Sequence, residues 1–191
     1  PAGQYGKEGV LALLEQHPEI KFVSLVGIDL AGNDTDEKIP MAAFFDDYEA
    51  FFEGRAVQTD GSSVVLTNIA TLNNARVDMW GDPSVNWFVD YNYENIDETT
   101  GLPTGTLRIP AFLMHNYRYV DSRSILKRSC DYVRAELLSL IKEKGVPGMP
   151  HVKADDVVDI VFTSATELEF WVKTPSKTVT KKELSVSQRL Q

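Results

Sequence analysis

The pattern of apolar and polar positions divides the first part of the chain into one helix and two strands. Residues 4–16 carry apolar side chains at helical spacing, and Pro18 ends this predicted helix. Residues 21–28 are β-branched and apolar on both faces, which is typical of a buried strand. The segment 31–36 contains Gly, Asn and Asp, which favour a turn. Residues 37–43 are therefore predicted to pair back as the second strand of a hairpin.

A cluster of aromatic residues follows the predicted hairpin. These residues recur at helical spacing among acidic residues and before Gly54, which predicts an amphipathic helix. They are Phe44, Phe45, Tyr48, Phe51 and Phe52. Further short strands are predicted near 63–69, 71–79, 85–91 and 106–112, with a turn-rich loop over 92–105. One main helix packed on a sheet of several strands indicates an α+β fold.

A longer helix is predicted over residues 122–144. Asp121 can cap its start, and Gly145 with Pro147 ends it. Its apolar stripe consists of Ile125, Leu126, Val133, Leu137, Leu140 and Ile141. A strand is then predicted over 157–172, followed by a polar tail over 173–191. A helix and a strand with nothing after them cannot bury both faces, so we expect the chain to be a fragment.

Composition and charge narrow the classes of function. The 191 residues are 43% hydrophobic and 25% charged, values of a globular protein. The net charge of −9 argues against non-specific nucleic-acid binding, which needs clustered Lys and Arg. No apolar run approaches the length of a membrane span, so no membrane contact is expected. The single cysteine, Cys130, excludes an intramolecular disulfide, and the predicted location is the cytoplasm.

The first candidate site is the pair Glu167 and Glu169 in the predicted strand. Side chains alternate along a strand, so both carboxylates would point to one face, roughly 6–7 Å apart at Cβ. Each could then reach a different cation of a pair separated by about 3.5–4 Å. Carboxylate oxygens favour Mg²⁺ or Mn²⁺. The alternative is a strand with one solvated face, where alternating Glu is common.

The second candidate is the turn Asp60–Ser63, which we call the latch turn. Asp-Gly followed by two hydroxyls forms a tight turn with several exposed hydrogen-bonding groups. By itself this pattern indicates only a turn. The three histidines have no partner at metal-ligand spacing, so none is assigned a role.

Five motifs in order resemble the glutamine synthetase family. They span Val26 to Gly32 (V-G-I-D-L-A-G), Asp60 to Ser63 (D-G-S-S), Val77 to Pro83 (V-D-M-W-G-D-P), Asp121 to Arg128 (D-S-R-S-I-L-K-R) and Glu167 to Phe170 (E-L-E-F). Each motif is short, but their order and spacing are specific. The resemblance covers residues 20–173.

The resemblance implies a fold and a domain division. Residues 1–18 would form an N-terminal helix, and residues 19–112 a β-grasp domain. Residues 113–191 would hold the first helix and strand of a truncated catalytic α/β barrel. The later metal ligands, the nucleotide site and the catalytic arginines of the family would lie beyond Gln191, so the fragment alone would be inactive.

The resemblance also implies the chemistry. The family joins ammonia to glutamate, using ATP and forming γ-glutamyl phosphate, with paired Mg²⁺ or Mn²⁺ ions neutralising the transferring phosphoryl group. Glu169 would bind the cation nearer glutamate and ammonia, and Glu167 the cation at the ATP phosphates. Asp60 would attract ammonium across a subunit interface and help to deprotonate it, with Ser63 shaping the turn and Asp78 contributing more weakly. The full protein would be a ring homo-oligomer.

The sequence departs from the family pattern at several positions. Val77 stands where the family has Ser, and Ser122 where it has Pro. Residues 110–115 lack a cysteine-aspartate pair often seen before the helix. Two other readings stay open: a γ-glutamyl ligase that uses another amine, and a non-catalytic scaffold or regulatory homologue. The retained Asp60 favours ammonia, and the retained Glu pair favours an enzyme.

Overall fold

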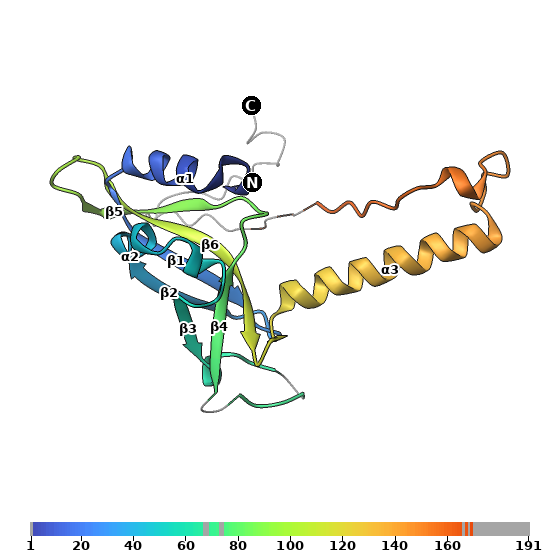
Figure 1. The fold of residues 1–191 in the computed structure, drawn as a ribbon, viewed down its shortest axis with the longest axis horizontal. Coiled ribbons are helices and arrows are strands. Elements are labelled where there is room, and N and C mark those ends of the chain that lie inside the picture. Colours follow the sequence, from blue (N-terminus) through green and yellow to red (C-terminus); the bar gives the residue numbers. More distant parts are fainter. Residues whose placement is uncertain (1, 67–68, 73–74, 166, 168, 170–191) are drawn as a thin grey trace, which may run out of the picture. The chain divides into compact units, whose positions relative to one another are not determined.

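The computed structural model describes residues 2–66, 69–72, 75–165, 167 and 169 (Figure 1). The chain divides into two units, residues 1–160 and 161–191, which are described separately. All helices and strands of the described residues lie in the first unit, which combines α and β structure as predicted. Of the helices in the described part of the chain, none has the length and hydrophobicity that a membrane-spanning segment needs.

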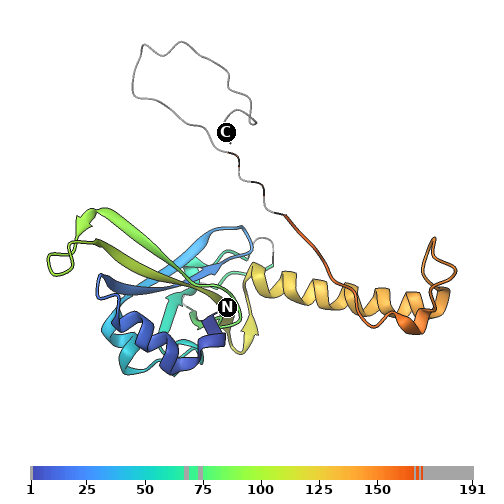
Figure 2. The same ribbon diagram turned by 90° about the horizontal axis from the view of Figure 1, so that it is seen from above.

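The long strand β6 (Pro103–His115) organises a mixed sheet, seen from a second side in Figure 2. β1 (Ile20–Ile28) pairs with it in parallel, while β5 (Phe88–Ile96), β4 (Arg76–Gly81) and β7 (Arg118–Tyr119) pair with it antiparallel. The edge strands β2 (Asp34–Pro40) and β3 (Val57–Asp60) complete the order β2-β1-β6-β4-β3. β6 also continues across the predicted domain boundary at 112.

The predicted hairpin is confirmed. β1 pairs antiparallel with β2 (Asp34–Pro40) from Ile28 opposite Asp34 to Phe22 opposite Pro40. Gly32 has a φ of +88°, a conformation that L side chains rarely adopt, so the turn depends on this glycine. β2 ends earlier than predicted because the helix α2 (Met41–Asp46) starts directly after Pro40.

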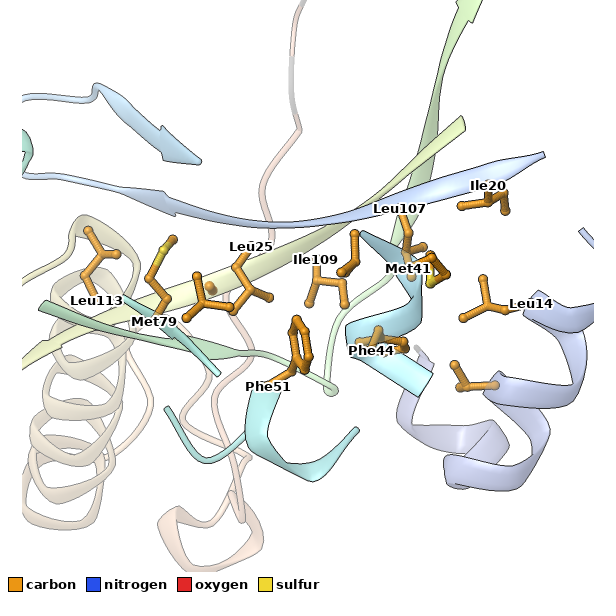
Figure 3. Packing of buried hydrophobic residues seen from close by; sticks show 14 of the residues in the cluster. Leu14, Ile20, Leu25, Met41, Phe44, Phe51, Met79, Leu107, Ile109 and Leu113 are labelled. Carbon is orange, nitrogen blue, oxygen red and sulfur yellow. The ribbon is translucent and has the colours of Figure 1, made fainter. Parts of the chain in front are cut away.

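The hydrophobic core lies between the sheet and the segments that cover one of its faces (Figure 3). The predicted N-terminal helix is present as a 3₁₀ turn, Ala2–Tyr5, followed by α1 (Gly6–Glu15). α1 contributes Val10 and Leu14 to the core. Phe44 and Phe51 are almost fully buried, and burial of each side chain contributes about 1.5–3 kcal/mol.

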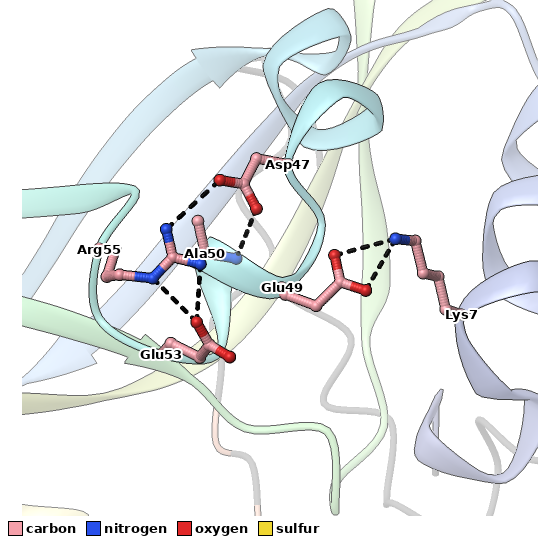
Figure 4. A network of polar contacts seen from close by, with 6 residues as sticks. All are labelled: Lys7, Asp47, Glu49, Ala50, Glu53 and Arg55. Carbon is pink, nitrogen blue, oxygen red and sulfur yellow. Dashed lines mark hydrogen bonds and ion pairs between the residues drawn. The ribbon is translucent and has the colours of Figure 1, made fainter.

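The single aromatic helix predicted over residues 44–53 is wrong, because the segment breaks at Asp47. α2 ends at Asp46, and a 3₁₀ turn, Glu49–Phe51, follows. The Asp47 carboxylate accepts a hydrogen bond from the Ala50 N–H, which caps the second turn and interrupts the helix. Arg55 forms ion pairs with Asp47 and Glu53, and Lys7 of α1 forms one with Glu49 (Figure 4). These ion pairs connect the interrupted segment to α1 and to the chain that follows it.

The later strands differ from their predicted bounds. The strand expected at 63–69 is wrong for the described residues 63–66 and 69, while 67 and 68 lie outside the described residues. A short strand, β3 (Val57–Asp60), precedes that segment, and the chain then turns through Gly61–Ser63. The apolar run that follows still buries Val64 and Leu66, so its hydrophobicity reflects core packing rather than strand pairing. The predicted loop over 92–105 shrinks to a turn because β5 extends to Ile96 and β6 starts at Pro103.

The long helix α3 (Ser122–Lys144) has the predicted bounds. Asp121 caps it, and its carboxylate accepts hydrogen bonds from the backbone N–H groups of Ser124 at 2.8 Å and Leu113 at 3.0 Å. The helix ends at Gly145, whose φ is +79°. The predicted stripe includes Leu126, Val133 and Leu140, which are exposed in this chain.

The strand predicted over 157–172 is contradicted for its first part. Residues 154–156 form a 3₁₀ turn, and residues 157–165 are neither helix nor strand. The reason is the lack of a neighbouring strand: among the described residues no strand pairs with this segment, and Val158 and Val161 are exposed. The predicted positions 166, 168 and 170–172 lie outside the described residues.

We predict that Asp121→Ala lowers the free energy of unfolding by about 2–3 kcal/mol, because two backbone donors lose their fully buried side-chain acceptor. Urea denaturation followed by circular dichroism measures this change. Asp131→Ala is the matched control, since Asp131 forms only an exposed i,i+4 pair with Lys127, worth about 0.2–0.5 kcal/mol. Equal losses in both variants would contradict the role given to Asp121.

Candidate functional site

The latch turn is built where β3 leaves the sheet. Asp60 is the last residue of β3 and the first of the latch turn. Its carboxylate accepts a hydrogen bond of 2.7 Å from the Ser62 N–H. Hydrogen bonds from the Ser62 side chain and backbone lower the pKa of the Asp60 carboxyl below its usual value of 3.8. Asp60 is exposed, so the turn presents an ionised carboxylate to solvent at neutral pH.

Gly61 allows this turn to approach the chain on its other side. A Cβ atom at Gly61 would lie 2.1 Å from the Leu72 carbonyl oxygen and 2.9 Å from that of Ala75. The Gly61 N–H donates a hydrogen bond of 2.7 Å to the Ala75 oxygen. Only glycine fits this close contact, which explains the Asp-Gly pair in physical terms.

Asp29 ties the latch turn to the β1–β2 hairpin. Its carboxylate is fully buried and accepts hydrogen bonds from the N–H groups of Ala31, Asn33 and Val65 and from the Asn33 side chain, at 2.8–3.0 Å. Val65 lies directly beyond the latch turn, and its oxygen accepts from the Leu30 N–H. Thr35 of β2 adds a hydrogen bond from its hydroxyl to the Ser63 oxygen. Ser63 is therefore held through its backbone by the hairpin.

The Asp29 carboxyl remains ionised despite its burial. Burial raises its pKa, but the hydrogen bonds from Asn33, Val65 and Ala31 together outweigh that effect, so its pKa lies below the usual 3.8. The contacts of Asp29 were not foreseen from the sequence. The signal was available in the segment Asp29 to Gly32, which is typical of a turn in which an Asp side chain bonds to nearby backbone.

The register of β3 and β4 places Asp60 and Asp78 on one face of the sheet. Asp60 lies opposite Arg76, and Gln58 lies opposite Asp78. Opposite residues of an antiparallel pair share a face, and residues two apart on a strand do so as well. The other face of β4 carries Val77 and Met79, which are fully buried in the core.

Asp78 differs from Asp60 in its surroundings. Arg76 Nε lies 3.1 Å from Asp78 Oδ1, so a cation of the same strand already neutralises this carboxylate. The N–H is not aligned with Oδ1, which is buried and has no hydrogen-bond donor among the described residues. The sequence did not reveal this pairing, because residues two apart are adjacent only on an extended strand.

The predicted metal ligands Glu167 and Glu169 lie in the second unit. Both are exposed, and neither is in a strand. Within the described residues, no group of three or more His, Cys, Asp or Glu side chains could hold a metal ion. Two carboxylates suit Mg²⁺ or Mn²⁺ by donor type but are too few for a complete site, so the metal assignment stays a prediction.

Comparison with known proteins gives a structural similarity only. No family model and no curated protein matches the chain. The fold resembles part of a glutamine synthetase. A glutamine synthetase of Plasmodium falciparum, solved by electron cryomicroscopy, matches 65% of this chain and 22% of its own, with a TM-score of 0.45 and 15% identity. A complex of GmaS with ADP matches 58% of this chain and 21% of its own, with a TM-score of 0.34 and 15% identity. The chain thus spans about a fifth of the length of these structures.

We predict that Asp29→Asn destabilises the protein by about 2–4 kcal/mol at pH 7, because a buried charged acceptor of several backbone donors is lost. The lowered folded-state pKa means that the contribution of Asp29 is fully present above its unfolded pKa, near 3.8. It is lost as the pH falls through the lower folded-state pKa. Urea titrations of both proteins between pH 7 and pH 2.5 should show a difference that shrinks only below about pH 4. A difference that is the same at every pH would contradict an ionised Asp29.

Proposed function

We propose that the chain is the N-terminal part of an ATP-dependent ligase that joins ammonia to the γ-carboxylate of glutamate. The observation that carries this proposal is the ionised Asp60 carboxylate, which stands exposed on a turn that Asp29, Gly61 and Thr35 hold in place. The five family-like motifs support the same reading, because two of them, at Asp29 and at Asp60, meet in this one structure.

In this proposal Asp60 supplies the charge that attracts ammonium. A carboxylate favours the cation, and it can accept the proton that ammonium must lose before its nitrogen attacks. The low pKa of Asp60 keeps the carboxylate ionised throughout the neutral range. Ser63 shapes the turn through its hydrogen-bonded backbone, and Asp78 adds a weaker influence because Arg76 already pairs with it.

The remaining parts of the proposed site lie in the second unit and in the rest of the proposed enzyme. Glu167 and Glu169 would hold Mg²⁺ or Mn²⁺, with Glu169 nearer glutamate and Glu167 nearer the ATP phosphates. The metal ions would neutralise charge on the transferring phosphoryl group. Glutamate, ammonia and ATP are the proposed substrates, and a ring of identical subunits is the proposed assembly, with Asp60 acting in the site of a neighbouring subunit.

We predict that the full-length protein forms glutamine when it is given glutamate, ammonium, ATP and Mg²⁺. Asp60→Asn should lower kcat/KM for ammonium by about 10²–10⁴-fold, since it removes both the charge and the proton acceptor. The effect on the KM for ATP should be small. Glutamine and inorganic phosphate are measured together, so that uncoupled ATP hydrolysis is recognised.

Asp46→Asn is the control for this experiment, because Asp46 is also an exposed aspartate and lies at the end of α2. Its activity should match that of the wild type. Glu169→Gln should lower the rate of glutamine formation strongly and raise the Mg²⁺ concentration needed for the half-maximal rate, because one of the two proposed cations loses a carboxylate ligand. A folded wild type that forms no glutamine, or an Asp60→Asn variant with unchanged kcat/KM for ammonium, would reject the proposed function.

A further inference from the structure

A cavity of about 450 Å³ lies beside the latch turn, between β4 and the turn that joins β6 to β7. We call it the β4 cavity. Its polar and aromatic lining consists of Arg76, Asp78, Trp80, His115, Asn116 and Tyr117. The volume lies within the range of small-molecule sites in proteins, and the cavity shares the face of the sheet that carries Asp60.

The cavity contains one carboxylate and one guanidinium that form only a weak ion pair with each other. The Arg76 side chain is 68% exposed and that of Asp78 is 28% exposed. Their contact of 3.1 Å lacks the alignment of a hydrogen bond. Because Arg76 is exposed and the contact is misaligned, the ion pair contributes little to stability, and a ligand that offers a better partner to each group can replace it.

Trp80 adds an aromatic ring to the same lining. Its indole N–H is buried and has no acceptor among the described residues. Gly54 makes room for the ring, because a Cβ atom at this position would lie 1.9 Å from Trp80 Nε1. The indole is therefore held in place by packing rather than by a hydrogen bond. Buried donors without a partner are rare in proteins.

The turn at the rim of the cavity is conformationally unfavourable. Asn116 and Tyr117 connect the paired residues His115 and Arg118, and both have positive φ, 48° and 60°. Such a two-residue turn favours Asn followed by Gly, so Tyr117 stands where glycine would fit best. Tyr117 is 95% exposed, so its side chain adds no packing in the core that would offset this unfavourable conformation. Unfavourable conformations of this kind concentrate at functional sites.

His115 fixes this turn to β4. Its Nδ1 lies 2.9 Å from the Arg76 carbonyl oxygen, and its Nε2 lies 2.9 Å from the Asn116 side-chain nitrogen. A neutral ring with its proton on Nδ1 satisfies both contacts, since Nδ1 donates and Nε2 accepts. The rim of the cavity is therefore held in one position by the strand that also carries Asp78.

We propose that the β4 cavity binds a small amino acid, or another amine that carries a carboxylate. The ammonium group pairs with Asp78, and the carboxylate pairs with Arg76. Two ion pairs thus replace the single misaligned one. Trp80 and Tyr117 cover the carbon chain and the ammonium group, as aromatic rings do in other amine sites. This binding requires neither ATP nor glutamate and does not depend on the proposed ligase activity.

The test titrates the 191-residue chain with β-alanine and follows the amide and indole signals by ¹H–¹⁵N NMR. The chain contains three tryptophans, so Trp80→Phe identifies the Trp80 indole signal by its loss. β-Alanine should shift this signal and saturate. Propylamine and propanoate, which each carry one of its two charges on the same carbon chain, should bind at least about tenfold more weakly.

Substitutions separate binding from folding. Asp78→Asn and Arg76→Gln should each weaken β-alanine binding by about tenfold or more, whereas Arg55→Gln, which removes another exposed paired arginine, should not. Tyr117→Gly should raise thermal stability because it relieves the positive φ, and yet it should weaken binding.

Two results would overturn the proposal. One is the absence of saturable shifts at Trp80 in a folded chain. The other is equal binding of propylamine or propanoate and β-alanine. Glutamine formation by the full-length protein is scored separately, so either idea can fail while the other stands.

Discussion

The parallel pairing of β1 with β6 is the constraint on which the rest of the architecture depends. Parallel strands cannot be joined by a tight turn, so Ile28 and Pro103 must be joined by a long connection. That long connection contains the second strand of the hairpin, the aromatic cover of the core, the latch turn and β4. The candidate site is therefore part of this long connection and lies at the end of the sheet where β1 stops.

Two fully buried carboxylates organise that end of the sheet. Asp29 follows β1 and binds the backbone of Val65, while Asp121 precedes α3 and binds the backbone of Leu113 in β6. Ser122 adds a hydrogen bond from its hydroxyl to the Ile28 carbonyl oxygen. Because both acids accept backbone N–H groups that would otherwise lack partners, they serve as fixed joints between the hairpin, the latch turn and the long helix.

Sequence patterns predicted those parts whose signals are local. The β1–β2 hairpin follows from an apolar run and a Gly-Asn turn, and α3 follows from an Asp cap, a periodic stripe and a terminal glycine. The strand expected at 63–69 failed because Val64 and Leu66 are apolar for core packing, which the sequence cannot distinguish from pairing. The strand expected from residue 157 failed because a strand needs a neighbour, and the neighbour is not encoded in the segment itself.

The same distinction applies to the candidate site. The Asp-Gly turn at Asp60 was visible in the sequence. The hydrogen bond that fixes this turn to the hairpin joins Val65 to Asp29, which are distant in sequence. Neither the hydrogen bonds of Asp29 to the latch turn and hairpin nor the Arg76–Asp78 pair could be inferred without the fold. Tyr117 in a glycine-type position was equally hidden, because its positive φ arises only when His115 and Arg118 pair across the turn.

Asp60 and Asp78 share a face of the sheet but hold their charges in different ways. Asp60 is stabilised by hydrogen bonds from Ser62, which lower its pKa without adding a positive charge. Asp78 instead lies 3.1 Å from the guanidinium of Arg76, so a positive charge already stands beside it. An incoming cation therefore meets a full negative charge only at Asp60, whereas at Asp78 it must first displace Arg76. A simple cation carries no negative group that could pair with the displaced Arg76, whereas a molecule with its own carboxylate does. The two proposals therefore assign different ligands to the two acids, a simple ammonium ion to Asp60 and a zwitterion to Asp78.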